Sequence, residues 1–237
     1  MKLSAPVYRL RRNAKLLSRE KKMPLVRALD EIARQEGYKS WSLLAARLSA
    51  EPPAAKLFSR LIPGDLLLVG ARPGHGKTLL GLELAMEAIK AGSPGKFFSL
   101  EFGTRDVQDC LHAIGVDHGS LEDGFEFDSS DAISADYLIP ALASAPIGTL
   151  VVIDYLQLLD QNRDRPALLA QVQALKSFAS QRGLILVFLS QIDRSYDPAE
   201  KPCPGLGDVR LPNPMDLTLF NKACFLHNGA IDFQTVH

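Results

Sequence analysis

Residues 70–78 read Gly70-Ala71-Arg72-Pro73-Gly74-His75-Gly76-Lys77-Thr78. A short apolar run at 66–69 precedes this stretch, and residues 79–91, which are rich in Leu, Ala, Met and Glu and lack proline, follow it. The apolar run suits a strand buried on both faces of a parallel sheet. The later segment suits a helix that stops at Gly92. A strand, a glycine-rich turn and a helix in this order predict a phosphate-binding loop.

The predicted loop binds its anion mainly through the backbone. Small residues let successive N–H groups and the positive end of the following helix point at a polyphosphate. Lys77 adds a full charge for the outer phosphates, and Thr78 presents a hydroxyl group to Mg²⁺. The residues expected to contact the nucleotide are consecutive: Arg72, Pro73, Gly74, His75, Gly76, Lys77, Thr78 and Leu79. The strict motif has glycine where this chain has Ala71, so the alternative is a glycine-rich turn with an incidental Lys-Thr pair.

Length and composition indicate an ordinary globular protein. The 237 residues are enough for one sizeable core and a small additional unit. No apolar run reaches the roughly 18 residues of a membrane span, and the basic start lacks the apolar centre of a signal peptide. We therefore expect a cytoplasmic protein without a membrane partner. The three cysteines show no metal-ligand spacing, which favours reduced structural thiols over a zinc site.

Positive charge is concentrated at the start of the chain. Residues 1–50 contain twelve Lys or Arg and four Asp or Glu, although the formal net charge of the whole chain is zero. Residues 1–48 are predicted to form a basic helical unit, and the proline-bearing stretch 49–56 a linker to a domain at 57–237. The basic first helix suits nucleic-acid phosphates or an acidic protein surface. The charges do not alternate with aromatic residues, so a merely solvated basic face is the alternative.

From residue 57 onward, strand-like runs alternate with helical segments. Strands are expected at 66–69, 97–100, 125–127, 149–153 and 184–189, and helices at 79–91, 104–114, 135–145 and 166–183. Residues 193–214 read as a long loop, and terminal strands are expected at 217–220, 223–226 and 231–236. This alternation predicts an α/β fold with a mostly parallel twisted sheet and helices on both faces.

Polar residues stand where three of these strands end. Asp154 ends the most apolar strand, where a carboxylate can hold the water shell of Mg²⁺ or merely cap the following turn. Glu101 follows the strand at 97–100 and is the preferred residue to position or deprotonate an attacking water, with Asp160 as the fallback. Gln191 follows the strand at 184–189, where a neutral amide can sense a terminal phosphate.

Five motifs occur in the order found in one known family. They are Gly-Ala-Arg-Pro-x-x-Gly-Lys-Thr at 70–78, Phe-Ser-Leu-Glu at 98–101, Val-Ile-Asp-Tyr-Leu-Gln-Leu at 152–158, Leu-Ser-Gln at 189–191 and Gly-Asp-Val-Arg at 207–210. On these motifs, the chain from about residue 57 to 236 resembles the C-terminal motor domain of bacterial replicative DNA helicases of the DnaB type, within the RecA-like P-loop ATPases.

The resemblance implies a function and a set of site residues. Its cofactors would be ATP and Mg²⁺, with Thr78 and Asp154 serving the metal. Its catalytic residues would be Lys77, Glu101, Asp154 and Gln191, with Gln191 as the phosphate sensor. Its partners would be single-stranded DNA and further copies of the chain in a hexameric ring.

The chain also departs from the family. The family carries a Lys-x-Arg pair near the C-terminus whose arginine reaches the neighbouring subunit's ATP, whereas this chain has no arginine after Arg210 and only Lys222 as a basic residue beyond it. The DNA-facing segment of the family corresponds to a shorter stretch at 211–216 that contains two prolines. Two functions therefore stay open: an ATP-driven DNA helicase or translocase, and a non-translocating RecA-like ATPase switch that regulates a protein partner.

Overall fold

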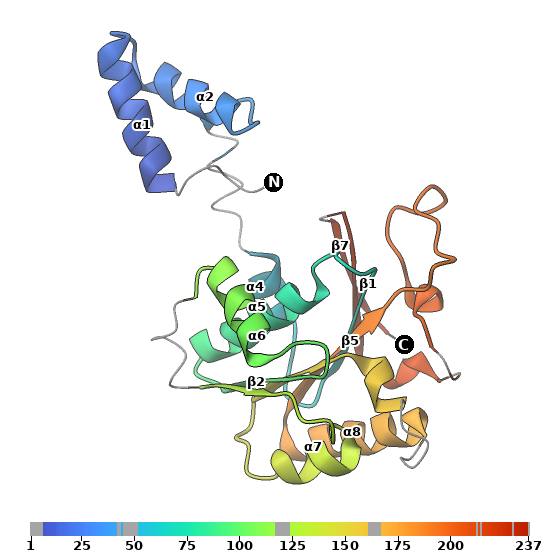
Figure 1. The fold of residues 1–237 in the computed structure, drawn as a ribbon. Helices are drawn as coiled ribbons and strands as arrows, with labels where there is room; N and C mark the ends of the chain where they lie inside the picture. The colour runs from blue at the N-terminus through green and yellow to red at the C-terminus, as the bar shows by residue number, and fades with distance from the viewer. Residues whose placement is uncertain are drawn as a thin grey trace. The chain divides into compact units, whose positions relative to one another are not determined.

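The computed structural model describes residues 7–41, 44, 52–116, 124–160, 167–211, 213, 215–228 and 230–236. The chain separates into two compact units, Met1–Pro52 and Pro53–His237 (Figure 1). Each unit has a hydrophobic core of its own. None of the helices in the described ranges has the length and hydrophobicity needed to span a lipid bilayer.

The first unit contains the helices α1 (Val7–Glu20) and α2 (Leu25–Gln35). Its small core is made by residues that recur at helical spacing: Leu10, Ala14, Ala28 and Ile32. The described basic side chains on and after α1 are exposed: Arg12, Lys15, Arg19, Lys21 and Lys22. The further helix expected after Ser40 falls mostly on residues outside the described ranges. The amphipathic pattern of α1 and α2 thus buries one apolar face and leaves the basic face to solvent.

The second unit is built on a seven-stranded sheet with the order β3-β2-β4-β5-β1-β6-β7. The strands are β1 (Leu66–Ala71), β2 (Gly95–Ser99), β3 (Phe125–Asp128), β4 (Leu150–Asp154), β5 (Ile185–Gln191), β6 (Lys222–His227) and β7 (Ala230–Thr235). All neighbouring pairs are parallel except β6 and β7, which are antiparallel. The mostly parallel α/β fold predicted from the sequence is confirmed.

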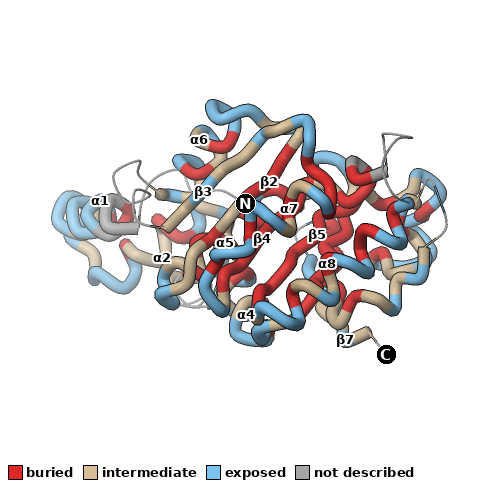
Figure 2. Tube along the Cα trace, turned by 90° about the horizontal axis from the view of Figure 1, so that it is seen from below, coloured by how far each residue is buried: buried red, intermediate tan, exposed pale blue. Residues whose placement is uncertain are grey.

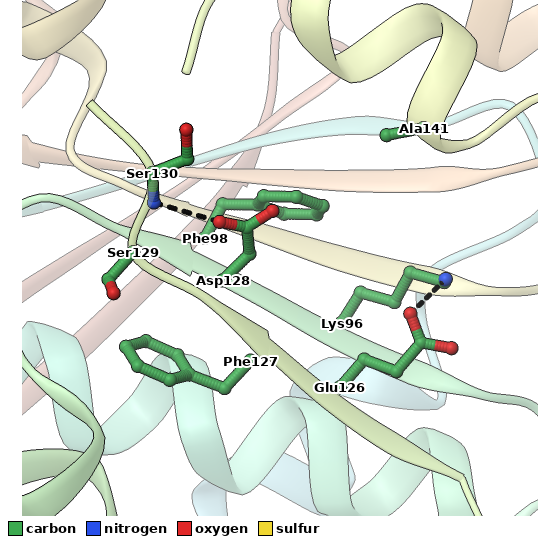
Figure 3. Close-up of a pocket in the computed structure, with 8 residues that line it drawn as sticks. All are labelled: Lys96, Phe98, Glu126, Phe127, Asp128, Ser129, Ser130 and Ala141. Carbon is green, nitrogen blue, oxygen red and sulfur yellow. Dashed lines mark hydrogen bonds and ion pairs between the residues drawn. The ribbon is translucent and has the colours of Figure 1, made fainter. Parts of the chain in front are cut away.

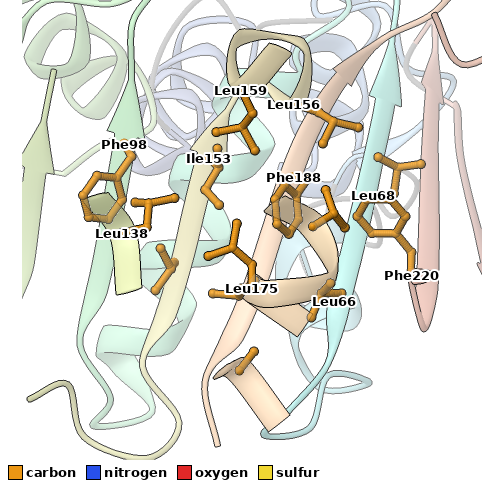
Figure 4. Close-up of a cluster of buried hydrophobic side chains, with 14 of the residues drawn as sticks. Leu66, Leu68, Phe98, Leu138, Ile153, Leu156, Leu159, Leu175, Phe188 and Phe220 are labelled. Carbon is orange, nitrogen blue, oxygen red and sulfur yellow. The ribbon is translucent and has the colours of Figure 1, made fainter. Parts of the chain in front are cut away.

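Helices cover both faces of this sheet (Figure 1). One face packs against α4 (Pro53–Phe58), α5 (Lys77–Lys90) and α6 (Thr104–Ala113), and the other against α7 (Ala135–Ala141) and α8 (Leu168–Arg182). The central strands are consequently buried almost throughout (Figure 2), which explains their unbroken apolar sequence. In the core beneath α7 and α8, the rings of Phe188 and Phe220 meet edge to face with centroids 5.4 Å apart (Figure 4).

Three segments differ from the sequence prediction in type or by more than two residues. The segment expected as a strand at 217–220 forms a short 3-10 helix, Leu217–Leu219, because the Asp216 carboxylate accepts a hydrogen bond from the Thr218 N–H (2.9 Å). Residues 53–56, expected in the linker, belong to α4, which proline can open because the first helical turn leaves its N–H groups unpaired. The helix expected over 135–145 ends at Ala141, one residue after Pro140.

Candidate nucleotide-binding and catalytic site

The expected phosphate loop joins the end of β1 to the start of α5. Gly74 and Gly76 have φ values of +79° and +87°, a region that favours glycine. Gly70 lies inside β1, where an added Cβ atom would come within 2.7 Å of the ring of Phe225. Ala71 is the last residue of β1, and its φ is not positive. The strand backbone therefore accepts a methyl group where the strict motif has glycine.

Lys77 is the first residue of α5, and its side chain is only 9% exposed. Its Nζ atom lies 3.1 Å from Oδ1 of Asp154 and 3.4 Å from Oε2 of Glu101. The same atom lies 5.3 Å from the centroid of the Tyr155 ring, within the range of a cation–π contact. The structure thus holds the predicted phosphate-binding ammonium between two carboxylates at the N-terminus of a helix.

Asp154 ends β4 with a fully buried side chain, and its Oδ2 accepts a hydrogen bond from Oγ1 of Thr78 at 3.0 Å. Burial raises the pKa of Asp154 above its ordinary value, and Glu101 adds to the rise, whereas Lys77 and Thr78 oppose it. A threonine hydroxyl and a carboxylate are oxygen ligands of the kind that Mg²⁺ uses directly or through its waters. The two residues therefore fit the metal that was expected beside the loop.

Glu101 emerges at the same edge of the sheet, because Ser99 of β2 pairs in register with Asp154 of β4. The buried Oγ of Ser99 accepts hydrogen bonds from the N–H groups of Glu101 and Phe102, both at 3.1 Å. The Glu101 side chain stays 35% exposed, against 0% for Asp154. Glu101 is thus the acid that an incoming water can reach. The side chain of the fallback residue, Asp160, lies outside the described part of the chain.

Gln191 ends β5 and lies beside Ala71 of β1. Its backbone carbonyl accepts a hydrogen bond from the Arg210 N–H at 2.8 Å, and its Oε1 atom accepts one from Nη1 of Arg210 at 3.4 Å. The motifs at 189–191 and 207–210 are therefore in direct contact. Arg210 belongs to the motif at 207–210, but its position in the sequence does not predict that it contacts Gln191.

A cavity of about 290 Å³ opens over the loop and the first turn of α5. Its lining contains most of the predicted residues and two that were not predicted: Pro73, Gly74, Gly76, Lys77, Thr78, Leu79, Glu101, Gln191, and the additional Phe102 and Cys110. Cys110 lies on α6 three residues after the buried Val107, so helical periodicity could have indicated its inward face. Asp154 lies buried behind Lys77 and Thr78 rather than in the lining.

A second cavity, of about 570 Å³, lies along β2 and β3 at the edge of the sheet (Figure 3). Lys96 and Glu126, which form an ion pair, both line it, and the Asp128 carboxylate accepts a hydrogen bond from the Ser130 N–H at 2.8 Å. None of the residues predicted to bind nucleotide lines it. It is therefore separate from the candidate site.

Arg72 and His75, although expected to bind nucleotide, do not line the cavity over the loop. Arg72 donates hydrogen bonds to the carbonyls of Arg194 (3.2 Å) and Tyr196, and its guanidinium lies 5.2 Å from the centroid of the Tyr196 ring. His75 stacks on His227 with ring centroids 5.0 Å apart. These contacts anchor the loop to the segment after β5 and to the end of β6. Sequence spacing could not indicate them, because Arg72 and Arg194 are 122 residues apart.

Lys222 lies at the opposite edge of the sheet from the phosphate loop. It begins β6 and pairs in register with Leu67 near the start of β1. Its ammonium group contacts the Asp65 carboxylate and the carbonyl of Arg60. Lys222 is thus used in a structural ion pair, and it is remote from its own chain's phosphate site.

Curated relatives of the chain are replicative helicases. The replicative DNA helicase DnaB of Mycoplasma genitalium is 25% identical over an alignment of 236 residues, and the match covers 81% of this chain and 50% of the relative. The DnaB helicase of Leifsonia xyli subsp. xyli is 28% identical over 189 residues, covering 65% of this chain and 41% of the relative. The chain therefore spans about half the length of the curated relatives it matches. No family model matches the chain.

Solved structures show the same architecture. One is an ATPase domain with a TM-score of 0.58 and 19% identity, covering 79% of this chain and 81% of that chain. Another is a DnaB-like replicative helicase, from a study that includes its interactions with primase, with a TM-score of 0.58 and 14% identity over 92% of this chain and 64% of that chain. The RecA-like fold is confirmed by these structures, and the resemblance to DnaB-type helicases by the curated relatives.

Proposed function

We propose that the chain binds and hydrolyses ATP as a RecA-like motor of the replicative helicase type. The observation that carries the proposal is that Nζ of Lys77 lies within 3.4 Å of a carboxylate oxygen of both Glu101 and Asp154, at the carboxyl edge of the sheet beside the phosphate loop. A module that only bound a partner would have no use for a nearly buried ammonium between two carboxylates. The similarity to DnaB helicases supports the same reading.

When bound, Mg²⁺ would neutralise negative charge on the phosphate oxygens. Lys77 binds the outer phosphates, while Thr78 and Asp154 hold the metal and its water shell. Glu101 orients a water molecule and accepts its proton as the water oxygen attacks the terminal phosphorus. The bond from that phosphorus to the bridging oxygen breaks, and ADP leaves with the electron pair of that bond. Gln191 contacts the terminal phosphate through its neutral amide.

The two carboxylates beside Lys77 differ in burial and in distance, and this difference suits the separate roles proposed for Asp154 and Glu101. Asp154 is buried and lies 3.1 Å from the ammonium, whereas Glu101 is partly exposed and lies 3.4 Å away. The Lys77–Glu101 pair is the longer of the two and is open to solvent on the Glu101 side, which weakens it, so phosphate oxygens can replace Glu101 beside Lys77. The carboxylate of Glu101 is then free to act on water, and Asp154 keeps Lys77 in place.

The proposed partners follow from the helicase relationship. Single-stranded DNA is the polymer on which such a motor would act, and a ring of six copies is the expected assembly. The exposed basic face of α1 supplies positive charge for phosphates. This face is also compatible with an acidic protein surface.

A second candidate function is a nucleotide-dependent switch that regulates a protein partner without translocating. The position of Lys222 favours it, because the ammonium group of this lysine is engaged with Asp65 and lies away from the phosphate loop. A ring motor needs a cation that reaches the neighbouring subunit's phosphates. Both candidates share the fold and the nucleotide site.

Turnover of ATP by the full chain, measured with and without single-stranded DNA and alongside the mass in solution, tests both candidates. Mg²⁺-dependent turnover supports the ATPase. A hexamer whose turnover rises strongly with DNA supports the motor, whereas slow turnover that DNA leaves unchanged supports the switch. Absence of Mg-ATP binding would refute both.

A further inference from the structure

Gln157 is a buried glutamine that joins three parts of the candidate site. It lies in the short 3-10 helix Leu156–Asp160, three residues after Asp154, and is 6% exposed. Its Nε2 atom donates a hydrogen bond to Oγ of Ser190 at 2.8 Å and another to the carbonyl oxygen of Arg210. One amide group thus connects the turn after the metal-binding strand, the end of β5 and the loop segment that carries Arg210.

The segment held by Gln157 is the one that carries the predicted phosphate sensor. Ser190 directly precedes Gln191, and Arg210 binds Gln191 through both its backbone N–H and its guanidinium. Ile192 and Val209 form an isolated antiparallel bridge just beyond this contact. A shift of the Gln157 amide would therefore move Gln191 and Arg210 together.

One end of the Gln157 amide lowers the stability of the fold, which indicates that the residue has a role other than stabilisation. Its Oε1 atom is buried and has no hydrogen-bond partner among the described residues, and an unpaired buried carbonyl opposes folding. Gln171 provides the contrast. It is 1% exposed, its Oε1 accepts a hydrogen bond from the Ala135 N–H at 3.1 Å, and its Nε2 donates one to the Leu159 carbonyl at 2.7 Å. Gln171 uses both ends of its amide to join α7 and the 3-10 helix to α8.

We propose that Gln157 is a positioning residue for ATP hydrolysis, which fixes Gln191 and Arg210 relative to the turn that follows Asp154. This inference rests on the proposed ATPase function. Gln157 touches neither the phosphates nor the metal-binding oxygens. It acts by setting where the Gln191 amide lies at the cavity over the loop, together with the Arg210 guanidinium that contacts this amide.

The matched variants are Gln157→Met and Gln171→Met in the full chain. Methionine has a similar length and fills the same space, but it cannot donate to the Ser190 hydroxyl or the Arg210 carbonyl. We expect kcat of Gln157→Met to fall about 10- to 10²-fold with KM within about twofold of wild type, since a small misplacement of reactive groups costs that much. Gln171→Met should lose thermal stability and keep its kcat per folded molecule.

A structural role alone would give a different result. If Gln157→Met lowered only the melting temperature, or lowered kcat no more than Gln171→Met, the positioning role would be refuted. Gln157→Glu adds a pH profile to the kinetic test. Burial raises the pKa of a carboxyl group placed there, and only its protonated form can donate to the Arg210 carbonyl. Turnover of Gln157→Glu relative to wild type should therefore rise as the pH falls.

Hydrogen exchange separates failure of this inference from failure of the proposed function. A wild-type chain without ATP turnover would refute the ATPase. In that case, the hydrogen-exchange rates of the backbone amides of residues 205–211, measured with and without Mg-ATP, would test the positioning role of Gln157. Faster exchange there in Gln157→Met, with wild-type exchange in Gln171→Met, supports the positioning role. Equal exchange in both variants overturns it.

Discussion

Thr78 donates a hydrogen bond from Oγ1 to Oδ2 of Asp154 at 3.0 Å, which joins the first turn of α5 to the end of β4. The other oxygen of the same carboxylate accepts a hydrogen bond from Lys77 at 3.1 Å. Two adjacent residues of the loop motif therefore share one buried acid that lies 76 residues beyond Thr78. Both carboxylate oxygens are oriented by these contacts, so the acid is held in place in advance. Loss of any one of these three side chains is expected to disturb the other two.

Replacement of Lys77 tests the phosphate site. We expect Lys77→Ala to weaken Mg-ATP binding by at least about 10-fold, because a charge-assisted hydrogen bond contributes roughly 1.5–3 kcal/mol. The control is Lys90→Ala at the other end of α5, where the side chain is 68% exposed and binding should match wild type. Titration with a fluorescent ATP analogue measures both. Equal affinity of Lys77→Ala and wild type would refute the site.

The same variant also has an expected pH dependence. Burial raises the pKa of Asp154, and loss of the Lys77 charge removes a contribution that lowers it. A folded-state pKa above the unfolded value means that stability is fully present below the unfolded pKa and is lost as the pH rises through the folded pKa. Melting temperatures of Lys77→Ala should therefore fall more than those of wild type from acidic to neutral pH. Parallel pH profiles would contradict this.

Glu101 and Asp160 can be separated by turnover. We expect Glu101→Gln to retain ATP binding while hydrolysis falls by roughly 10²- to 10⁴-fold, the usual effect of losing a general base. Glu126→Gln is the control, since that side chain is 69% exposed and pairs with Lys96 at the edge of the sheet. Single-turnover hydrolysis is the measurement. Full activity in Glu101→Gln, together with loss of activity in Asp160→Asn, would transfer the role to Asp160.

The three thiols should differ in reactivity. Cys224 is fully buried, and burial raises its pKa to about 12. Cys110 and Cys203 are partly exposed, and burial raises the pKa of each. Because the thiolate is the reactive form, Cys224 should be alkylated last in the folded chain at mildly alkaline pH. Mg-ATP should slow the alkylation of Cys110, which lines the cavity, and leave Cys203 unchanged.

Pulsed alkylation followed by mass spectrometry measures these rates. The unfolded chain in urea is the control, and its three thiols should react at similar rates. Alkylation of Cys224 in the folded chain as fast as that of Cys203 would contradict the buried position of β6.

The engagement of Lys222 with Asp65 predicts slow turnover by a protein made of these 237 residues. An arginine supplied by the next subunit contributes on the order of 10³-fold or more to turnover in related phosphoryl-transfer enzymes. A lysine lacks the planar fork that grips two phosphate oxygens, and Lys222 is bound to Asp65. We expect slow basal turnover, little stimulation by single-stranded DNA and no unwinding by this chain alone.

Alanine variants of Arg194, Arg210 and Lys222 test the origin of any stimulation. Lys222→Ala should lower the melting temperature and leave turnover per folded molecule unchanged, because it removes an ion pair remote from the loop. A hexamer whose turnover rises strongly with DNA would overturn the prediction. The variant that abolishes the rise would then identify the residue that acts across the interface.

Deletion of residues 1–50 tests the basic unit. The remaining chain should stay folded, because α4 and the sheet belong to a separate compact unit that begins at Pro53. If the basic helices bind nucleic acid, the deletion should lower the affinity for single-stranded DNA and flatten its salt dependence, since fewer counterions are released. Filter binding across a salt series measures both. If the deletion left the salt dependence of DNA binding unchanged, the basic unit would instead bind an acidic protein partner or be a solvated surface.

The sequence by itself determined the elements whose signals are local. The loop from Gly70 to Thr78 is one contiguous segment, so its glycines, Lys77 and the hydroxyl group of Thr78 are close in space because they are close in sequence. Asp154, Glu101 and Gln191 could be predicted to meet because parallel strands present their carboxyl ends at one edge. The apolar strands that carry these residues are buried on both faces, which leaves a clear pattern in sequence.

Only the tertiary structure decided contacts between segments far apart in the chain. Gln157 donates to Ser190, and Lys222 binds Asp65 across 157 residues. The segment 217–220 reads as a strand, yet the Asp216 cap turns it into a 3-10 helix. Hydrogen bonds and ion pairs depend on distances of a few ångströms, and these are set by the packing of the whole sheet. Residue type and spacing along the chain do not encode them.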